Sequence, residues 1–358
     1  IKLKPNFVEA HLNIGGIFYN LGKLNEAEIY TRKAIELNPA LAEAHSNLGT
    51  ILKDIGKLNL AKNAWEKAFK LDPNLTNAVQ YFAKQLFYEK KYELTIDFLN
   101  KYKYKNSEIL YLNCLLCLDK EKEFYQKYNE ISKIGLCNAE IGGIVEHANI
   151  IYEKKNDAIF CNQTINYIVL DKINEDLLSK DHLNELISYV SQEKTSMRNQ
   201  GTLHEGVQTS GNLFSLDYQF IQSIKKALEI KIDAYKEKFK ESGEGFIKNW
   251  PKDYELRSWM ISMKTGGYLK PHNHEYGWIT GSFYLQVPTR DQNNDEGNIS
   301  FSYQGPQYPI KGKTFNSTIK RIESRDICIF PSSLFHQTIP FKSNEERICF
   351  VFDLVQKT

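Results

Sequence analysis

The chain has 358 residues, of which 42% are hydrophobic and 25% are charged, and its 46 basic and 44 acidic residues give a formal net charge of +2. This length exceeds the size at which a single hydrophobic core usually stops growing, so we expect two domains. The near balance of charge gives no argument for binding nucleic acid or anionic lipid, and no stretch approaches the roughly 20 apolar residues of a membrane span.

Cysteine usage bears on the compartment. The six cysteines are few for this length and mostly lie in apolar runs, which suits buried free thiols in a reducing environment. We therefore expect a cytoplasmic protein. The sequence begins at Ile1, inside a repeated motif and without an initiator Met, so we also expect it to be a fragment of a longer chain.

A repeat with a period of 34 residues runs through the first part of the chain. Small residues recur where the two helices of a repeat must approach closely, and a proline recurs where the second helix ends. The matching positions are Pro5/Pro39/Pro73, Ala10/Ala44/Ala78, Gly15/Gly49, Gly22/Gly56, Ala27/Ala61 and Ala34/Ala68.

The repeat pattern weakens along the chain. Lys90 stands where Gly56 predicts a glycine, and residues 107–165 keep helical patterns without repeat landmarks. The period and the residue types resemble tetratricopeptide repeats, so we expect an N-terminal α-solenoid over residues 1–165. The resemblance implies a concave surface that binds a peptide or protein segment. A solenoid forms the same groove when it only acts as a scaffold, and the sequence leaves both roles open.

The second half has the pattern of a β-rich domain with flanking helices. Helical patterns cover residues 177–191 and 218–240, and many short strand patterns follow. This order favours a sandwich or jelly roll, so we expect a double-stranded β-helix over residues 166–358. The predicted strands are Leu256–Met263, Tyr268–His274, Gly281–Val287, Asn298–Tyr303, Ile327–Phe330 and Arg347–Val355.

Three histidines of this domain are candidate metal ligands. His272 and His274 lie two positions apart on a predicted strand, so both imidazoles point to one face and can meet at one ion. His336 follows an apolar strand and is the third candidate. The other histidines have structural explanations as helix or loop residues, namely His11, His45, His147, His182 and His204.

Arg347 heads the apolar last strand, eleven residues after His336. Burying a lone arginine is costly unless an anion meets the guanidinium, ideally a carboxylate in bidentate geometry. The alternative is that Arg347 lies at the strand end in solvent and pairs with Glu345 or Glu346.

Residues 256–355 resemble the Fe(II)/2-oxoglutarate-dependent oxygenases, including prolyl-hydroxylase-like members and oxygenases joined to tetratricopeptide repeats. The resemblance implies Fe(II) as the metal and 2-oxoglutarate as co-substrate. It further implies His272 and His336 as metal ligands, Arg347 as the partner of the distal carboxylate of 2-oxoglutarate, and Tyr284 as a hydrogen-bonding partner of that carboxylate. The motifs that carry it are His272-Asn-His274, Trp278-Ile-Thr-Gly-Ser-Phe-Tyr284-Leu and Phe330-Pro-Ser-Ser-Leu-Phe-His336.

His274 departs from the family pattern, because it stands where these enzymes have their carboxylate ligand. Three neutral imidazoles would leave the metal charge at +2 rather than +1. We include His274 in the catalytic and metal-binding set; the alternative is that a water takes the ligand position and His274 lies behind it. Glu275 is adjacent, but on an extended strand it faces the other way.

These features predict an oxygenase that hydroxylates a peptide or protein recruited by the repeats, with no nucleic-acid or membrane partner. A second interpretation is a three-histidine cupin that does not use 2-oxoglutarate. Gly266, His272 and His274 fit the first cupin motif. The glutamate of that motif is missing, because Trp278 and Ile279 stand in its place. A third is a repeat scaffold with a degenerate jelly roll. Only the 2-oxoglutarate enzyme needs Arg347. The sequence leaves the substrate and the oligomeric state open.

Overall fold

The chain folds into two compact units in a computed structural model that describes residues 4–191, 197–198, 200–289 and 294–357. The first unit comprises residues 1–124, 195–200 and 209–211, and the second comprises residues 125–194, 201–208 and 212–358. All six cysteines are free thiols. No helix among the described residues is long and apolar enough to span a membrane.

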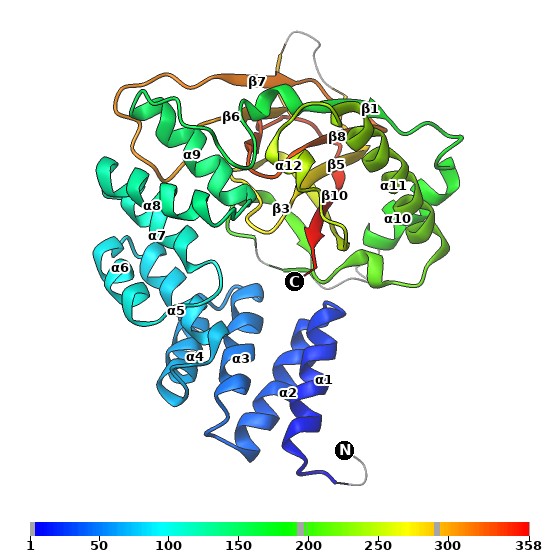
Figure 1. The fold of residues 1–358 in the computed structure, drawn as a ribbon. Helices are drawn as coiled ribbons and strands as arrows, with labels where there is room; N and C mark the ends of the chain where they lie inside the picture. Colours follow the sequence, from blue (N-terminus) through cyan, green and yellow to red (C-terminus); the bar gives the residue numbers. More distant parts are fainter. Residues whose placement is uncertain (1–3, 192–196, 199, 290–293, 358) are drawn as a thin grey trace. The chain divides into compact units, whose positions relative to one another are not determined.

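The first unit is a stack of helical pairs (Figure 1). The starts of α1, α3 and α5, and those of α2, α4 and α6, are each spaced by the 34-residue period, so the third repeat keeps the backbone of the first two. The predicted repeat solenoid is therefore confirmed. The helices are α1 (Val8–Asn20), α2 (Leu24–Leu37), α3 (Ala42–Asp54), α4 (Leu58–Leu71), α5 (Thr76–Tyr88), α6 (Tyr92–Lys101) and α7 (Ser107–Cys117); β2 (Met197–Arg198) also belongs to this unit.

The predicted close approach of paired helices is confirmed at Gly49. A Cβ atom on this residue would lie 2.4 Å from ring atoms of Trp65, and the Trp65 indole donates a hydrogen bond to the Ser46 carbonyl at 3.2 Å. Trp65 also stacks on Tyr81 of the next repeat, with 4.5 Å between ring centroids. The missing side chain at Gly49 thus admits the ring that connects two repeats.

Each of the first three repeats turns between its helices through a residue in the left-handed backbone region. The residues are Gly22 (φ 74°), Gly56 (φ 90°) and Lys90 (φ 59°). Glycine adopts this conformation without a steric penalty, whereas a residue with a Cβ atom is strained there. Lys90 therefore preserves the turn at an energetic cost, which explains how the array continues past the point where its sequence pattern weakens.

The boundary between the compact units lies after Phe124, earlier than the boundary expected after residue 165. Helix α8 (Glu121–Lys133) spans this boundary, and α9 (Ala139–Ile151) clusters with the β-rich unit. The physical reason is that hydrogen bonds join α9 to the β-rich unit. The buried His147 ring donates a hydrogen bond to the Pro309 carbonyl at 3.0 Å and accepts one from the Gly305 amide at 3.1 Å.

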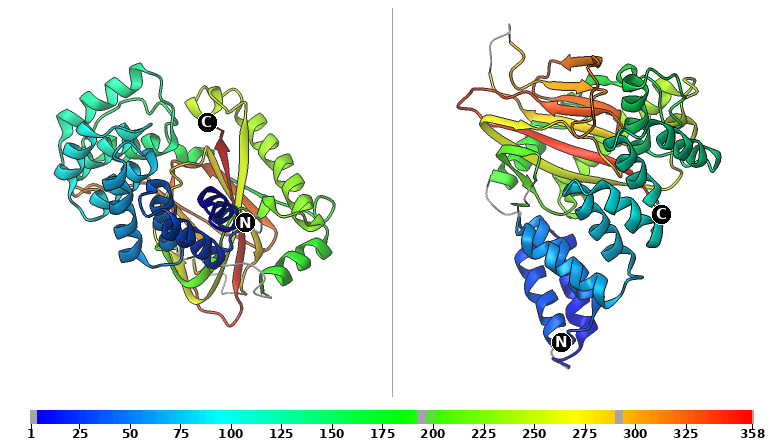
Figure 2. Two further views of the ribbon diagram at one scale, coloured as in Figure 1. Left: turned by 90° about the horizontal axis from the view of Figure 1, so that it is seen from below. Right: turned by 90° about the vertical axis from the view of Figure 1, so that its left-hand side faces the viewer.

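Two antiparallel sheets of the second unit form the predicted jelly roll. The larger has the strand order β1-β8-β5-β10-β4-β3 within this unit, and the smaller has the order β7-β6-β9. Figure 2 shows the long strands β4 and β10 side by side. The strands are β1 (Val169–Lys172), β3 (Leu203–Thr209), β4 (Tyr254–Leu269), β5 (Ile279–Gln286), β6 (Ile299–Ser302), β7 (Ser317–Lys320), β8 (Asp326–Pro331), β9 (Phe335–Thr338) and β10 (Arg347–Gln356).

Strand β10 is the centre of the larger sheet, between β4 and β5. All of its residues but the last are buried, which accounts for its nearly continuous apolar sequence, because a strand covered on both faces needs no polar alternation. The predicted flanking helices are confirmed as α10 (Lys180–Ser191) and α11 (Gln219–Phe239), and the short α12 (Gly245–Lys248) follows them.

Two strand predictions need correction. The segments expected as separate strands on either side of Gly266 form the single strand β4, because Gly266 takes a positive φ of 80° within the strand and does not end it. Strand β4 ends at Leu269, so His272 and His274 lie beyond it. Strands β1, β2, β3, β7 and β9 were not predicted; all of them except β3 are four residues long or shorter.

The left-handed turn yields a test of repeat equivalence. We expect Lys90→Gly to stabilise the first unit and Gly56→Lys to destabilise it, each by about 1 kcal/mol, because the left-handed conformation penalises a Cβ atom by about 1–2 kcal/mol and the unfolded-state entropy of glycine offsets part of this gain. Thermal unfolding followed by helical circular dichroism measures both. Shifts of the same sign would contradict the equivalence of the two turns.

Glu146 of α9 gives the second unit a pH-dependent stability. Its carboxylate accepts two hydrogen bonds from Thr164, at 3.0 and 2.7 Å, yet desolvation outweighs them and raises the pKa of Glu146 to about 7. The folded state then holds a proton that the unfolded chain releases above its ordinary pKa near 4.5. Stability is therefore lost as the pH rises from about 4.5 to 7.

We expect Glu146→Gln to remove this dependence, which amounts to about 3 kcal/mol if the whole shift acts on folding. Urea unfolding of wild type and variant at several pH values between 4.5 and 7.5 measures it. An unchanged slope in the variant would show that another group carries the pH dependence.

Candidate metal centre

The three predicted histidines come together in the second unit. One ring nitrogen of each of His272, His274 and His336 lies within 4.8 Å of the other two. His336 is on β9, and His272 pairs with it across an antiparallel bridge, with amide-to-carbonyl distances of 3.0 and 2.9 Å. The His274 amide donates to the Ser332 carbonyl at 3.1 Å. Backbone pairing thus fixes the positions of all three rings.

Hydrogen bonds orient each ring in the same way. The Nδ1 atom of His272 lies 2.8 Å from the Lys270 carbonyl, that of His336 lies 3.2 Å from the Leu334 carbonyl, and that of His274 lies 2.7 Å from a carboxylate oxygen of Asp353. All three partners accept hydrogen bonds, so each Nδ1 carries the proton and each Nε2 keeps its lone pair. The three Nε2 atoms are therefore the ones that would bind a metal ion.

The electrostatic setting favours the neutral form of the His272 and His336 rings. Burial, followed by the neighbouring His274, lowers the pKa of His272 to about 4. Burial and the other two histidines hold the pKa of His336 well below its ordinary value. A neutral imidazole is the form that binds a metal ion.

Asp353 is a site residue that the sequence analysis missed. It lies on β10, is 8% exposed, and its Oδ1 also accepts a hydrogen bond from Thr280 at 2.7 Å. The Thr280 hydroxyl lies 2.7 Å from that of Ser332. Asp353 is 79 residues from His274 in sequence, so no local motif connects the two. The one sequence signal for Asp353 is the alternation of side chains along β10, which sets it on the same face as Arg347.

Arg347 is buried rather than solvent-exposed. It is 2% exposed, its Nε donates to the Gly297 carbonyl at 3.0 Å, and the guanidinium lies over the Tyr284 ring at 5.0 Å. Its alternative partners are engaged elsewhere: Glu345 accepts from the Thr289 amide and Glu346 from the Ser262 hydroxyl, each at 2.7 Å. No ion pair joins Arg347 to any described carboxylate, so the solvent-exposed alternative is wrong.

Tyr284 places an unpaired hydroxyl in the same core. The residue is fully buried, and its hydroxyl has no hydrogen-bond partner among the described residues. Burial raises the pKa of Tyr284 far above its ordinary value, so the phenol stays protonated and can donate. A buried polar group without a partner costs about 1–3 kcal/mol. An anion beside Arg347 would satisfy both side chains.

The remaining histidines have the structural roles expected of them where the structure gives contacts. His11 and His45 occupy equivalent repeat positions and bond to the carbonyls of Pro5 and Pro39, at 2.7 and 3.0 Å. His204 stacks on Tyr268 with 4.4 Å between ring centroids. Within the described chain, Glu275 is not a member of the cluster that could hold a metal.

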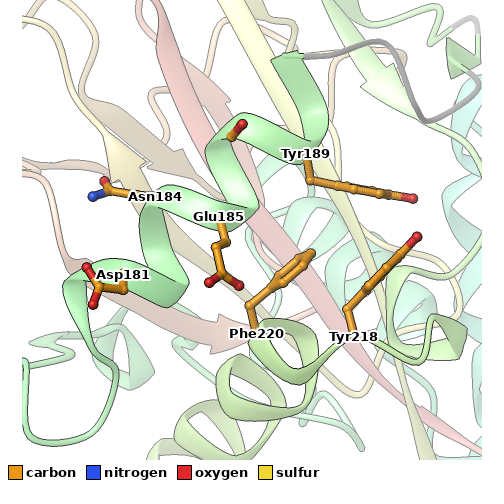
Figure 3. Close-up of a pocket in the computed structure, with 7 residues that line it drawn as sticks. Asp181, Asn184, Glu185, Tyr189, Tyr218 and Phe220 are labelled. Carbon is orange, nitrogen blue, oxygen red and sulfur yellow. The ribbon is translucent and has the colours of Figure 1, made fainter.

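A separate pocket of about 610 Å³ lies over α10 and the start of α11 (Figure 3). It shares no residue with the histidine cluster, and its lining combines two carboxylates with three aromatic rings: Asp181, Glu185, Tyr189, Tyr218 and Phe220. Such a lining suits a cationic group rather than a dicarboxylate. This pocket is therefore not a candidate site for 2-oxoglutarate.

Family comparisons agree with the two units. Residues 257–353 match the family described as "Putative 2OG-Fe(II) oxygenase", and residues 8–41 and 42–75 each match a tetratricopeptide repeat family. The chain thus carries tetratricopeptide repeats and a domain of the 2-oxoglutarate–Fe(II) oxygenase type. A search of curated proteins found no match.

Several solved structures are similar to parts of the chain. A Pseudomonas putida prolyl-4-hydroxylase is 10% identical, with a TM-score of 0.36 over 53% of this chain and 93% of its own. The α-ketoglutarate-dependent epimerase SnoN from nogalamycin biosynthesis is 12% identical, with a TM-score of 0.37 over 53% and 79%. The tetratricopeptide protein YrrB, whose structure is described as having an unusual peptide-binding site, is 16% identical, with a TM-score of 0.37 over 44% and 84%.

Proposed function

We propose that the second unit is an Fe(II)- and 2-oxoglutarate-dependent oxygenase that hydroxylates its substrate. The observation that carries the proposal is a buried Arg347 guanidinium without a carboxylate, over the ring of Tyr284, whose hydroxyl is unpaired. Both residues lie in the same core as the histidine cluster, because Tyr284 packs with Phe301 and Phe330, and these rings contact His336. A metal and a dicarboxylate together would complete this site.

The donor set fits the metal. His272, His274 and His336 would hold it through Nε2, and Fe(II) accepts imidazole ligands. When bound, the metal and 2-oxoglutarate supply the oxidative chemistry, in which decarboxylation to succinate accompanies oxygen transfer to a C–H bond. Arg347 and Tyr284 would hold the distal carboxylate, which leaves the 2-oxo acid end directed at the metal. The apolar rings around His336 would exclude water.

The repeats support a peptide or protein substrate. Tetratricopeptide solenoids form a concave surface suited to an extended segment, and we propose that this surface recruits the substrate of the oxygenase unit. A cupin-type enzyme and a non-catalytic scaffold remain the competing functions. Both predict no affinity for 2-oxoglutarate, whereas the buried Arg347 favours the oxygenase.

The ligand assignment predicts the effect of removing each histidine. We expect His272→Ala and His336→Ala to abolish stoichiometric Mn(II) binding, measured by anaerobic calorimetry, because a single ion needs several convergent donors. His182→Ala, which alters a helical histidine outside the cluster, is the control and should bind as wild type does. Tight binding retained in both cluster variants would reject the assignment.

Arg347→Lys tests the co-substrate. Lysine keeps the charge but loses the planar fork, so we expect 2-oxoglutarate binding to Mn(II)-loaded protein to weaken by about 1.5–3 kcal/mol while metal binding survives. Arg257→Lys, on an exposed part of β4, is the matched control. Calorimetry measures affinity, and succinate release with Fe(II) and 2-oxoglutarate measures uncoupled turnover. No binding to wild type, or equal affinity in wild type and Arg347→Lys, would remove the case for 2-oxoglutarate.

A further inference from the structure

Asp353 is a buried carboxylate without a cationic side chain to neutralise it. It is 8% exposed on the central strand β10, between the fully buried Phe352 and Leu354. Among the described residues, its one ion-pairing partner is the His274 ring. Arg257 lies opposite Asp353 in the strand register but pairs with Glu255 instead. An isolated buried carboxylate is strongly unfavourable unless positive charge reaches it.

The contacts of Asp353 direct its charge toward the metal centre. A carboxylate only accepts hydrogen bonds, so the 2.7 Å contact fixes the His274 proton on Nδ1 and leaves Nε2 for a metal. The Thr280 hydroxyl donates a hydrogen bond to the same oxygen at 2.7 Å. Trp259 stacks on the His274 ring, with 5.7 Å between centroids at 26°. The ring is thus held along the line from the carboxylate to the candidate metal position.

We propose that Asp353 replaces, through the His274 ring, the carboxylate ligand that this site lacks. Asp353 is a positioning residue: it orients Nε2, fixes the tautomer and brings one negative charge next to the three-imidazole set. The metal in turn supplies the positive charge that the buried carboxylate needs. This inference rests on the proposed metal site, and it goes further by assigning the missing charge to a particular residue of β10.

The simplest test is removal of the charge. We expect Asp353→Asn to weaken Mn(II) binding about 10–100-fold, as is typical when the hydrogen-bond partner of a metal-ligating histidine is lost. Asp326→Asn is the matched control, because Asp326 is a buried carboxylate at the start of β8 that accepts a hydrogen bond from the Glu323 amide. Its metal affinity should equal that of wild type.

A second pair of variants separates a charge role from a general structural role. His274→Asp moves a carboxylate to the ligand position but leaves Asp353 close to it, so the two like charges repel and metal binding should be impaired. The double variant His274→Asp/Asp353→Asn removes the repulsion. We expect the double variant to bind Mn(II) more tightly than the His274→Asp single variant. Asp353→Asn should therefore weaken Mn(II) binding in the wild-type background and strengthen it in the His274→Asp background.

The possible results separate the two proposals. If wild type binds no Mn(II), the proposed function fails. If wild type binds but Asp353→Asn and Asp326→Asn bind equally well, Asp353 plays no part at the metal. If Asp353→Asn weakens binding in both backgrounds, Asp353 acts only by supporting the fold, and the proposal is overturned. The Co(II) absorption spectrum, which reports ligand geometry, should change in Asp353→Asn and remain unchanged in Asp326→Asn.

Discussion

The site that we propose for the second unit is built on two buried charged residues of opposite sign on β10. Arg347 and Asp353 are six positions apart on the strand, so both side chains point to the same face. The described part of the chain offers Arg347 no carboxylate, and the one ion-pairing partner that it gives Asp353 is the His274 ring. Buried charges are ordinarily paired. We therefore propose that a bound metal and co-substrate supply the partners of these two charges.

The backbone bridge between His272 and His336 connects the larger sheet to the smaller one. His336 lies on β9 of the smaller sheet, whereas His272 follows β4, the neighbour of β10 in the larger sheet. Because the bridge pairs the two residues directly, their rings must lie close together, with 4.4 Å between centroids. His274, in the loop after β4, is held by its amide bond to the Ser332 carbonyl and by its ring contact with Asp353. The geometry of the cluster follows from the way the two sheets close on one another.

Sequence patterns predicted the repeats and the strands β4, β5, β6, β8 and β10, because recurring residue types and apolar runs mark them directly. The 34-residue period, the apolar run of β10 and the His-x-His spacing are signals of this kind. Lys90 weakened the repeat signal because the left-handed turn conformation is fixed by the repeat backbone, although lysine does not favour it.

Long-range pairing explains what the sequence did not reveal. Helix α9 retains a helical pattern, but its place in the second unit depends on contacts of His147 with residues about 160 positions later, at separations of 158 and 162. Asp353 was also not predicted, because the sequence does not indicate which histidine an acidic residue in a strand will contact. The three histidines were found because each sits in a local motif, and their carboxylate partner was missed because it does not.

The charges explain why a site with three imidazoles remains compatible with an oxygenase. A divalent metal and dianionic 2-oxoglutarate cancel one another, and Arg347 and Asp353 contribute one positive and one negative charge, so the complete set is neutral. In the usual arrangement the carboxylate binds the metal directly; here it stands one ring behind. In the proposed site the charge of Asp353 would act on the metal more weakly than a direct ligand, because Coulomb energy falls with distance. A bound metal would then keep more of its positive charge and favour the 2-oxo acid end, while Arg347 and Tyr284 would hold the other end. On this proposal, the departure at His274 would alter the strength of co-substrate binding and leave the total charge of the site unchanged.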